Sequence, residues 1–244
     1  LSVLPDCECK DKAKISFCKT FFKKNVKIYH FSPFLLPERH KSCPKRLEHL
    51  KIFAHMKSIK GTCTEQNLLK AFAGESQARN RYPFFAKRAR KEGYEQIAEI
   101  FATIASQEQE HAEIFFKLLE GGKATIVEAT YPAGRIASTY ENLLAAAEGE
   151  REEWDTLYPS FAVTAEREGL HEVASVFRLI STIEVEHETR FLSMAELLTD
   201  GNFFRRDQDI WWQCRNCGFV CRAKEAPLLC PACQHPQGYF EPKP

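Results

Sequence analysis

Apolar residues recur at helical spacing in four long stretches of the chain. In the first stretch, Leu68, Leu69 and Phe72 fall on one helical face, and Thr62-x-x-Glu65 just ahead has the form of a capping box. This helix is predicted to end at Glu92-Gly93, because glycine readily takes the left-handed conformation that closes a helix. The same pattern predicts three more helices, from Tyr94 to Gly122, from near Arg135 to Gly169, and from Leu170 to Gly201.

The segment from Lys123 to Gly134 has no helical period and contains Pro132. A dozen extended residues reach roughly 40 Å, about the length of a 25-residue helix. The segment can therefore cross the whole bundle between the second and third helices. We expect a mainly α protein with a ferritin-like four-helix bundle and one crossover, in preference to an up-down-up-down bundle.

The two helix pairs repeat each other at a constant spacing along the chain. Tyr82-Pro83-x-Phe85-Ala86 returns as Tyr158-Pro159-x-Phe161-Ala162, and at the same spacing Ile97-Ala98 returns as Val173-Ala174. We interpret the bundle as a duplicated helix hairpin with pseudo-twofold symmetry. The two prolines each remove a backbone hydrogen bond, so they are expected to kink the first and third helices.

Each half of the repeat contains a Glu-x-x-His pattern, Glu108-x-x-His111 and Glu184-x-x-His187. Residues three apart lie on one helical face, so each copy can direct a carboxylate and an imidazole into the bundle. Two such helices facing two helices that each give a Glu form the ligand set of di-iron and di-manganese carboxylate proteins. If these groups are buried they need a cation. The alternative is that they face water as a charged helix surface.

The first helix offers Glu75 to such a site, and the third offers Glu150 and Glu153. Strict repetition would align Glu75 with Arg151, so one extra residue of winding, such as a π-bulge, is expected between Gly149 and Tyr158. Hard oxygen ligands with one imidazole per metal favour iron or manganese. The repeated tyrosines, Tyr82 and Tyr158, are candidate hydrogen-bond donors to the ligands. The alternative is that they only pack in the core.

Charge separates the beginning of the chain from this bundle. The net charge is +1 over 244 residues, but residues 1–55 hold twelve Lys or Arg against five Asp or Glu. This part has no sustained helical or strand period, so we interpret it as a basic extension outside the native domain, which would begin at Met56. A nucleic-acid arm or a Cys/His metal site in the extension is the weaker alternative. No stretch of eighteen apolar residues and no signal-peptide layout is present, and we expect a cytoplasmic protein without a membrane or nucleic-acid partner.

Residues 202–244 contain two Cys-x-x-Cys pairs separated by twelve residues. Pairs of this kind form a tetrahedral four-thiolate metal site, and Cys221, which lies between them, is expected to be a bystander thiol. The spacing leaves open a structural zinc ribbon and a one-electron iron site. A redox dimetal centre in the same chain favours iron, because the iron site can supply the electrons. The four cysteines are Cys214, Cys217, Cys230 and Cys233.

From Met56 to about Glu241 the chain resembles rubrerythrins. The resemblance rests on Phe72-Ala73-Gly74-Glu75-Ser76-Gln77-Ala78-Arg79-Asn80-Arg81-Tyr82, on both Glu-x-x-His copies and on the two cysteine pairs. It implies a ferritin-like di-iron domain over residues 56–201, a linker with a rubredoxin-like iron domain over residues 202–244, and a head-to-tail homodimer. It also implies that one iron exchanges Glu153 for His111 with redox state. The implied di-iron ligands are Glu75, Glu108, His111, Glu150, Glu153, Glu184 and His187, and the four cysteines are the implied ligands of a third iron.

The resemblance predicts an oxidoreductase, a peroxidase that reduces hydrogen peroxide to water in oxidative-stress defence. Its catalytic residues would be Glu108, His111, Glu153 and Glu184. Electrons would arrive through the rubredoxin-like site from a reduced rubredoxin or an NADH-linked flavin reductase. The alternative is a ferroxidase or iron-storage protein with a structural zinc ribbon. A structural bundle with a nucleic-acid-binding ribbon ranks third, since the chain from Met56 onward is net acidic.

Overall fold

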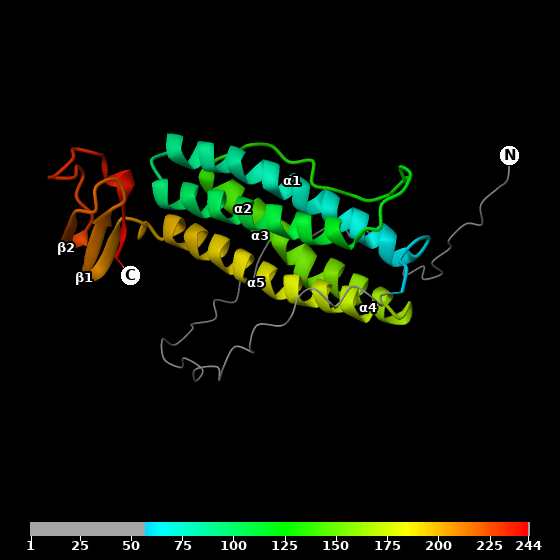
Figure 1. Cartoon of the computed structure of the whole chain (residues 1–244). Coiled ribbons are helices and arrows are strands. Elements are labelled where there is room, and N and C mark those ends of the chain that lie inside the picture. The colour runs from blue at the N-terminus through cyan, green and yellow to red at the C-terminus, as the bar shows by residue number, and fades with distance from the viewer. Residues whose placement is uncertain (1–56, 244) are drawn as a thin grey trace, which may run out of the picture. The chain divides into compact units, whose positions relative to one another are not determined.

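The computed structural model describes residues 57–243, so the predictions for residues 1–55 and for a start at Met56 lie outside the described residues. Figure 1 shows α1 beside α2, with α3 and α4 following one another along α5. The elements in chain order are α1 (Cys63–Lys91), α2 (Glu95–Leu118), α3 (Thr139–Glu152), the π-helix η2 (Glu153–Leu157), α4 (Tyr158–Arg167), α5 (His171–Thr199), β1 (Arg205–Cys214), β2 (Val220–Glu225), the 3₁₀ helix η3 (Gln237–Tyr239) and β3 (Phe240–Pro242).

Side-chain caps set where the first and third helices begin. The predicted cap of α1 is present, with Thr62 Oγ1 accepting a hydrogen bond from the Glu65 amide at 3.1 Å. The third helix begins at Thr139, later than the start near Arg135 that periodicity predicts. The reason is a complete capping box between Ser138 and Glu141, which satisfies the first free amides of the helix at that position.

Each hairpin also supplies a carboxylate to the other hairpin's first helix. Glu168 accepts hydrogen bonds from the amides of Cys63 and Thr64, both at 2.9 Å. Glu92, which holds the equivalent position in the first half of the repeat, accepts one from the amide of Thr139 at 2.9 Å. A negative charge at a helix N-terminus is favourable, because the free amides there carry partial positive charge. The reciprocal contacts are a structural expression of the repeat.

Two apolar clusters fill the bundle, and they are related by the same repeat. Phe85 and Phe101 pack with ring centroids 5.6 Å apart and planes at 66°, and Phe161 and Phe177 pack at 5.5 Å and 66°. Buried aromatic side chains of this size contribute a large part of the folding free energy. The pseudo-twofold symmetry predicted from the sequence therefore extends to the packing of the core.

The connection between the hairpins runs along the bundle, as expected for a ferritin-like topology with one crossover (Figure 1). It is joined to α1 by a hydrogen bond from the Tyr131 hydroxyl to the Lys70 carbonyl at 3.1 Å. This contact places the crossover over one side of the helix that carries Glu75.

The C-terminal residues form a three-stranded antiparallel sheet in the order β2-β1-β3. Its small core holds Trp212 and Phe240, both fully buried, with two of the cysteines. Near the turn between α1 and α2, Tyr94 packs against Phe203 and Phe204 of the linker. Gly238 lies so close to the Gly93 carbonyl that a Cβ atom at position 238 would overlap with it, which explains the glycine there.

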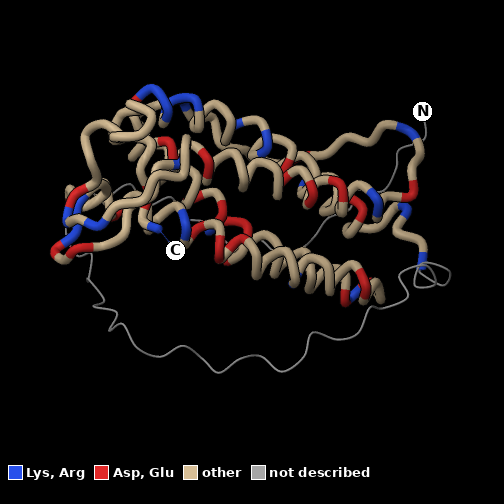
Figure 2. The backbone as a smooth tube through the Cα atoms, turned by 60° about the vertical axis from the view of Figure 1, so that its left-hand side comes forward, with Lys and Arg blue, Asp and Glu red and all other residues tan. Residues whose placement is uncertain are grey.

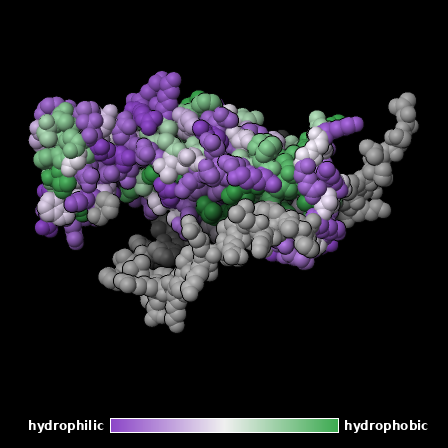
Figure 3. Space-filling model, in the orientation of Figure 1, coloured by the Kyte–Doolittle hydropathy of each residue, from purple (hydrophilic) through white to green (hydrophobic). Residues whose placement is uncertain are grey.

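Charged residues of both signs are distributed along the helices (Figure 2). The face seen in Figure 3 is mostly hydrophilic, with apolar patches between the polar side chains. Among residues 57–243, no helix combines the length and the apolar character that crossing a membrane requires.

Candidate metal centres

Four helices bring six of the predicted ligands together in the middle of the bundle. They form two groups of four in which the ligand atoms lie within 4.8 Å of one another. Glu108 and Glu184 belong to both groups, so they occupy the positions from which a carboxylate can bridge two ions. All six side chains are buried. One group is Glu75, Glu108, His111 and Glu184, and the other is Glu108, Glu150, Glu184 and His187.

The two groups have closely similar geometry. His111 Nδ1 lies 3.0 Å from an oxygen of Glu108, 3.0 Å from one of Glu184 and 3.8 Å from one of Glu75. His187 Nδ1 lies 2.9 Å from Glu108, 2.7 Å from Glu184 and 3.8 Å from Glu150. The imidazole rings face each other with centroids 5.8 Å apart. Glu75 and Glu150 thus take equivalent places.

Burial and mutual repulsion shift the protonation of this cluster. Burial and the neighbouring Glu108 charge raise the pKa of Glu75 well above its usual range and that of Glu150 to about 8. Burial alone would also raise the pKa of Glu108, but its contacts with His111 and His187 lower it to about 2. Although burial opposes it, the surrounding carboxylates raise the pKa of His187 to about 12. The directions of these shifts show that the buried carboxylates favour positive charge beside them.

Several buried ligand atoms in the cluster have no partner with the geometry of a hydrogen bond, although the distances between His187 Nδ1 and the carboxylates are short. Unsatisfied buried polar atoms are costly and rare in native proteins, and here they converge on one place. Metal cations bound in the two groups would satisfy them. With two histidines and four carboxylates, the residues present fit a di-iron carboxylate centre. The atoms concerned are Glu75 Oε2, Glu108 Oε1, Glu150 Oε2, both oxygens of Glu184, and His187 Nδ1.

The repeated tyrosines hold carboxylates of the opposite hairpin. The Tyr158 hydroxyl donates to Glu75 Oε1 at 2.5 Å, and the Tyr82 hydroxyl donates to Glu150 Oε1. Both tyrosines are buried, and burial together with the nearby carboxylates raises the pKa of each phenol. They therefore act as hydrogen-bond donors while also packing in the two apolar clusters.

Gln107 contacts the ligand His187, and the sequence did not reveal this contact. Its Oε1 lies 3.1 Å from Nε2 of His187, on the side of the ring away from the carboxylates. A partner on the second nitrogen fixes the orientation of a ligand imidazole. The repeat places Ile183 at the equivalent position of the second half, so this contact belongs to one half only. The signal was hidden because Gln107 lies beside Glu108 in a run of polar residues.

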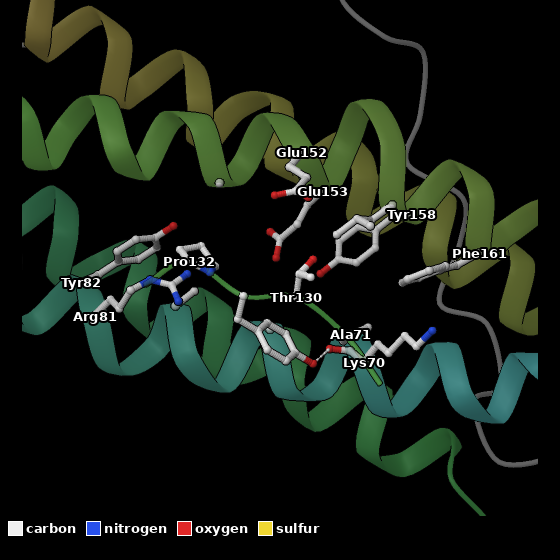
Figure 4. Close-up of a pocket in the computed structure, with 16 residues that line it drawn as sticks. Lys70, Ala71, Arg81, Tyr82, Thr130, Pro132, Glu152, Glu153, Tyr158 and Phe161 are labelled. Atoms are coloured by element: carbon white, nitrogen blue, oxygen red, sulfur yellow. Dashed lines mark hydrogen bonds between the residues drawn. The ribbon is translucent and has the colours of Figure 1, made fainter. Parts of the chain in front are cut away.

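Glu153, the seventh predicted ligand, lies outside both four-residue groups. It lines a cavity of about 230 Å³ between α1, the crossover and the η2 region. In Figure 4 its carboxylate extends into this cavity beside Tyr158, with Thr130 of the crossover opposite. Burial, and next the Glu75 carboxylate, raise the pKa of Glu153 well above its usual range. The cavity therefore connects the surface of the crossover with a protonatable group beside the centre.

The η2 π-helix accounts for the unequal spacing of ligands and tyrosines. The step along the chain from Glu75 to Glu150 is shorter by a single position than the step from Tyr82 to Tyr158. The extra residue is absorbed between Glu153 and Leu157, where the Tyr158 amide bonds back to the Glu153 carbonyl. This is the additional winding expected between Gly149 and Tyr158. Pro159 follows directly, at the start of α4.

The four paired cysteines form a second group in the C-terminal module. Cys214 and Cys233 sulfurs lie 3.8 Å apart, and those of Cys217 and Cys230 lie 3.6 Å apart. A hydrogen bond from the His235 amide lowers the pKa of Cys233 to about 6, which favours the thiolate that binds metal. Cys221 is not part of the group. The residues fit a rubredoxin-like four-cysteine iron site.

The chain matches known proteins over both metal-binding regions. A family model described as rubrerythrin matches residues 66–195, and one described as the rubredoxin-like domain of rubrerythrin matches residues 212–241. Rubrerythrin of Porphyromonas gingivalis is 61% identical over 186 residues, covering 76% of this chain and 92% of that protein. Rubrerythrin of Nitratidesulfovibrio vulgaris is 54% identical, covering 76% and 97%. A solved structure of fully reduced, all-ferrous nigerythrin is similar with a TM-score of 0.52 at 30% identity, covering 85% of this chain and 100% of that one. The chain belongs to the rubrerythrin family.

Proposed function

We propose that this protein is a non-haem di-iron peroxidase that reduces hydrogen peroxide to water. The observation that carries the proposal is the combination of a buried carboxylate and histidine centre, a cavity lined by Glu153 and by the two tyrosines that bind its carboxylates, and a four-cysteine site in the same chain. With iron bound, the centre would supply two electrons to the O–O bond, and two protons would complete two water molecules. A two-electron centre and a one-electron donor site in one chain suit this reaction.

The chain's own residues would divide the work. Glu108 and Glu184 would hold both ions, while Tyr82 and Tyr158 fix Glu150 and Glu75 through their hydroxyl groups. Fixing the ligands in this way keeps the centre in one geometry before the substrate arrives.

Glu153 and His111 would follow the redox change. The structure holds one arrangement, with His111 inside a ligand group and Glu153 outside it in the cavity. Because its pKa is raised, the Glu153 carboxyl can hold a proton at the place where a small substrate would enter. Glu153 would donate this proton to an oxygen of the reduced peroxide. When the iron centre is oxidised, the Glu153 carboxylate would take the place of the His111 imidazole as a ligand.

The cysteine site would pass electrons to the centre one at a time. We propose a reduced rubredoxin or an NADH-linked flavin reductase as the external donor, a homodimer as the working form and the cytoplasm as the location. A reducing compartment agrees with four cysteines arranged for metal rather than for disulfides.

Anaerobically reduced protein, mixed rapidly with hydrogen peroxide or with oxygen, tests the proposal. We expect the four-cysteine iron to be oxidised much faster by peroxide, with two electrons taken per peroxide. Glu108→Ala should abolish this while leaving the four-cysteine spectrum unchanged. Faster oxidation by oxygen with deposition of mineral would instead support the ferroxidase and storage alternative, as would stoichiometric zinc in the cysteine site.

A further inference from the structure

The π-helix η2 is held by side chains of α5 that are distinct from the ligands. Glu188 is 5% exposed and follows His187 directly, but its carboxylate points to the third helix instead of the centre. One oxygen accepts from Nε of Arg151 at 2.6 Å, and the other accepts from Nε1 of Trp154 at 2.7 Å. Glu188 therefore binds one side chain that precedes Glu153 in the chain and one that follows it.

A third contact secures the backbone of the same turn. The Ser181 hydroxyl donates to the main-chain carbonyl of Trp154 at 3.1 Å. A π-turn is rare because the α-helical spacing of hydrogen bonds competes with it. The Ser181 hydroxyl satisfies one carbonyl of the turn, and Glu188 holds a side chain before Glu153 and one after it. These contacts favour the π-turn over regular α-helical winding.

The internal repeat supplies a natural comparison. The counterparts of Ser181 and Glu188 in the first half are Ala105 and Ala112, both buried, and neither has a side chain that could make these hydrogen bonds. Ahead of the extra residue Glu75 and Glu150 take equivalent places, so the counterpart of Arg151 on α1 is Ser76. In that half α1 runs without a π-turn from Cys63 to Lys91. The second half therefore has the three contacts together with the π-turn. Among the described residues of the first half, neither the contacts nor a π-turn is present.

The π-turn sets the relative orientation of two side chains that must each keep their partner. Glu150 must stay in its ligand group, and Tyr158 must stay on Glu75. In a plain α-helix each residue turns by about 100°, so removing the extra residue of winding would rotate one of the two away from its partner. Glu153 lies between them in the chain, and its carboxylate takes no part in the three contacts described above.

We propose that Glu188 is a positioning residue. By holding Arg151 and Trp154, with Ser181 on the Trp154 carbonyl, it keeps η2 wound so that Glu153 can move between the cavity and the centre while the helix stays in register. We refer to these contacts as the η2 clamp. The movement of Glu153 rests on the proposed function, whereas the winding of η2 does not.

Hydrogen exchange of the full-length protein as purified tests the winding. In Glu188→Ala and in Trp154→Phe, which keeps an aromatic ring but removes the indole N–H, the amides of residues 154–158 should exchange about tenfold faster or more, as expected for loss of a charge-assisted hydrogen bond. Glu188→Gln keeps an acceptor for Trp154 and should fall between. The control is Glu166→Gln, which breaks the exposed pair with Arg178 at 2.8 Å and should not change this segment. Unchanged exchange at residues 154–158 in both clamp variants would overturn the proposal.

The action through Glu153 has its own readout. The electron paramagnetic resonance spectrum of partly reduced protein should shift in Glu188→Ala and in Glu153→Ala, and the double variant should match Glu153→Ala alone. Additive shifts would show that Glu188 acts on the centre by another route and would contradict the positioning role. Neither measurement depends on peroxide turnover, so loss of the proposed activity and loss of the clamp are distinguishable.

Discussion

The hydroxyl of Tyr158 donates a 2.5 Å hydrogen bond to Glu75, a residue of the other hairpin that lies far earlier in the chain. The bond ties a ligand of one half to the apolar cluster of the other, and Tyr82 makes the reverse contact with Glu150. The two hairpins therefore share one centre instead of each building its own.

We expect Tyr158→Phe to weaken metal binding. The change keeps the ring and its packing but leaves Glu75 Oε1 without its donor, and loss of such a partner typically lowers metal affinity by about 10- to 100-fold. Titration of the metal-free full-length protein with ferrous iron under anaerobic conditions measures this. Tyr140→Phe, at an exposed position, is the matched control. Equal affinity in the two variants would show that the phenol hydroxyl does not support the ligand.

Glu168 should make stability depend on pH. Burial opposes ionisation, but hydrogen bonds from Thr64 and from the Cys63 amide lower the pKa of Glu168 below its ordinary value of 4.5. The ionised carboxylate therefore stabilises the fold above about pH 4.5, and this stabilisation is lost as the pH falls through the lowered pKa of the folded state.

Urea unfolding of native protein and Glu168→Gln across pH measures this contribution. At neutral pH the variant should be less stable by about 1 kcal/mol, the net value of a hydrogen bond to a charged group after solvent screening. The difference should shrink in acid. Glu196→Gln, at an exposed site on α5, should show no such trend. A difference that is constant with pH would exclude the carboxylate charge as its source.

Gly74 controls the space beside Glu153. A Cβ atom there would lie 3.5 Å from Glu153 Oε1 and 3.9 Å from the Tyr131 ring, so Gly74→Ala fits and should slightly favour the helix. The longer side chain of Gly74→Leu would enter the cavity. We expect the second-order rate with peroxide to fall by about tenfold or more in Gly74→Leu, a loss typical of a blocked approach to the reacting group.

The pair of Gly74 variants separates access from folding. Iron content and thermal stability should stay near native in Gly74→Ala, and iron content should stay near native in Gly74→Leu. If Gly74→Leu keeps its full rate, the substrate reaches the centre by a path other than this cavity.

The four-cysteine site should be removable without loss of the buried centre. Cys214→Ser replaces a ligand in the group, so the module should lose its metal and most of its fold, because metal binding supplies folding free energy in so small a domain. Iron bound by the bundle should remain, while turnover with an external donor should stop. Cys221→Ser is the control, and loss of the module's metal in that variant would contradict the assignment of the four ligands.

Much of the fold follows from local sequence. The helices and the paired Glu-x-x-His motifs are set by the period of apolar residues and by spacing along one helix. Glycine follows the end of the first, third and fourth predicted helices, but the prediction for the second was wrong, because α2 ends at Leu118, ahead of Gly122. The internal repeat added the pseudo-twofold symmetry, from which pairing of the ligands follows. The extra winding near Glu153 was predictable because Arg151 stands where the repeat would place an acid.

Tertiary structure alone decided how these parts work together. The Tyr158 bond to Glu75, the Gln107 contact with His187 and the Glu188 clamp join residues that are distant in the sequence. No periodicity encodes such contacts, because they depend on which faces meet when the hairpins pack. The placement of Glu153 in a cavity, outside the two ligand groups, has the same origin. Sequence therefore determined which side chains could bind metal, and packing of the two hairpins decided which of them meet in the two ligand groups and which one lies apart in the cavity.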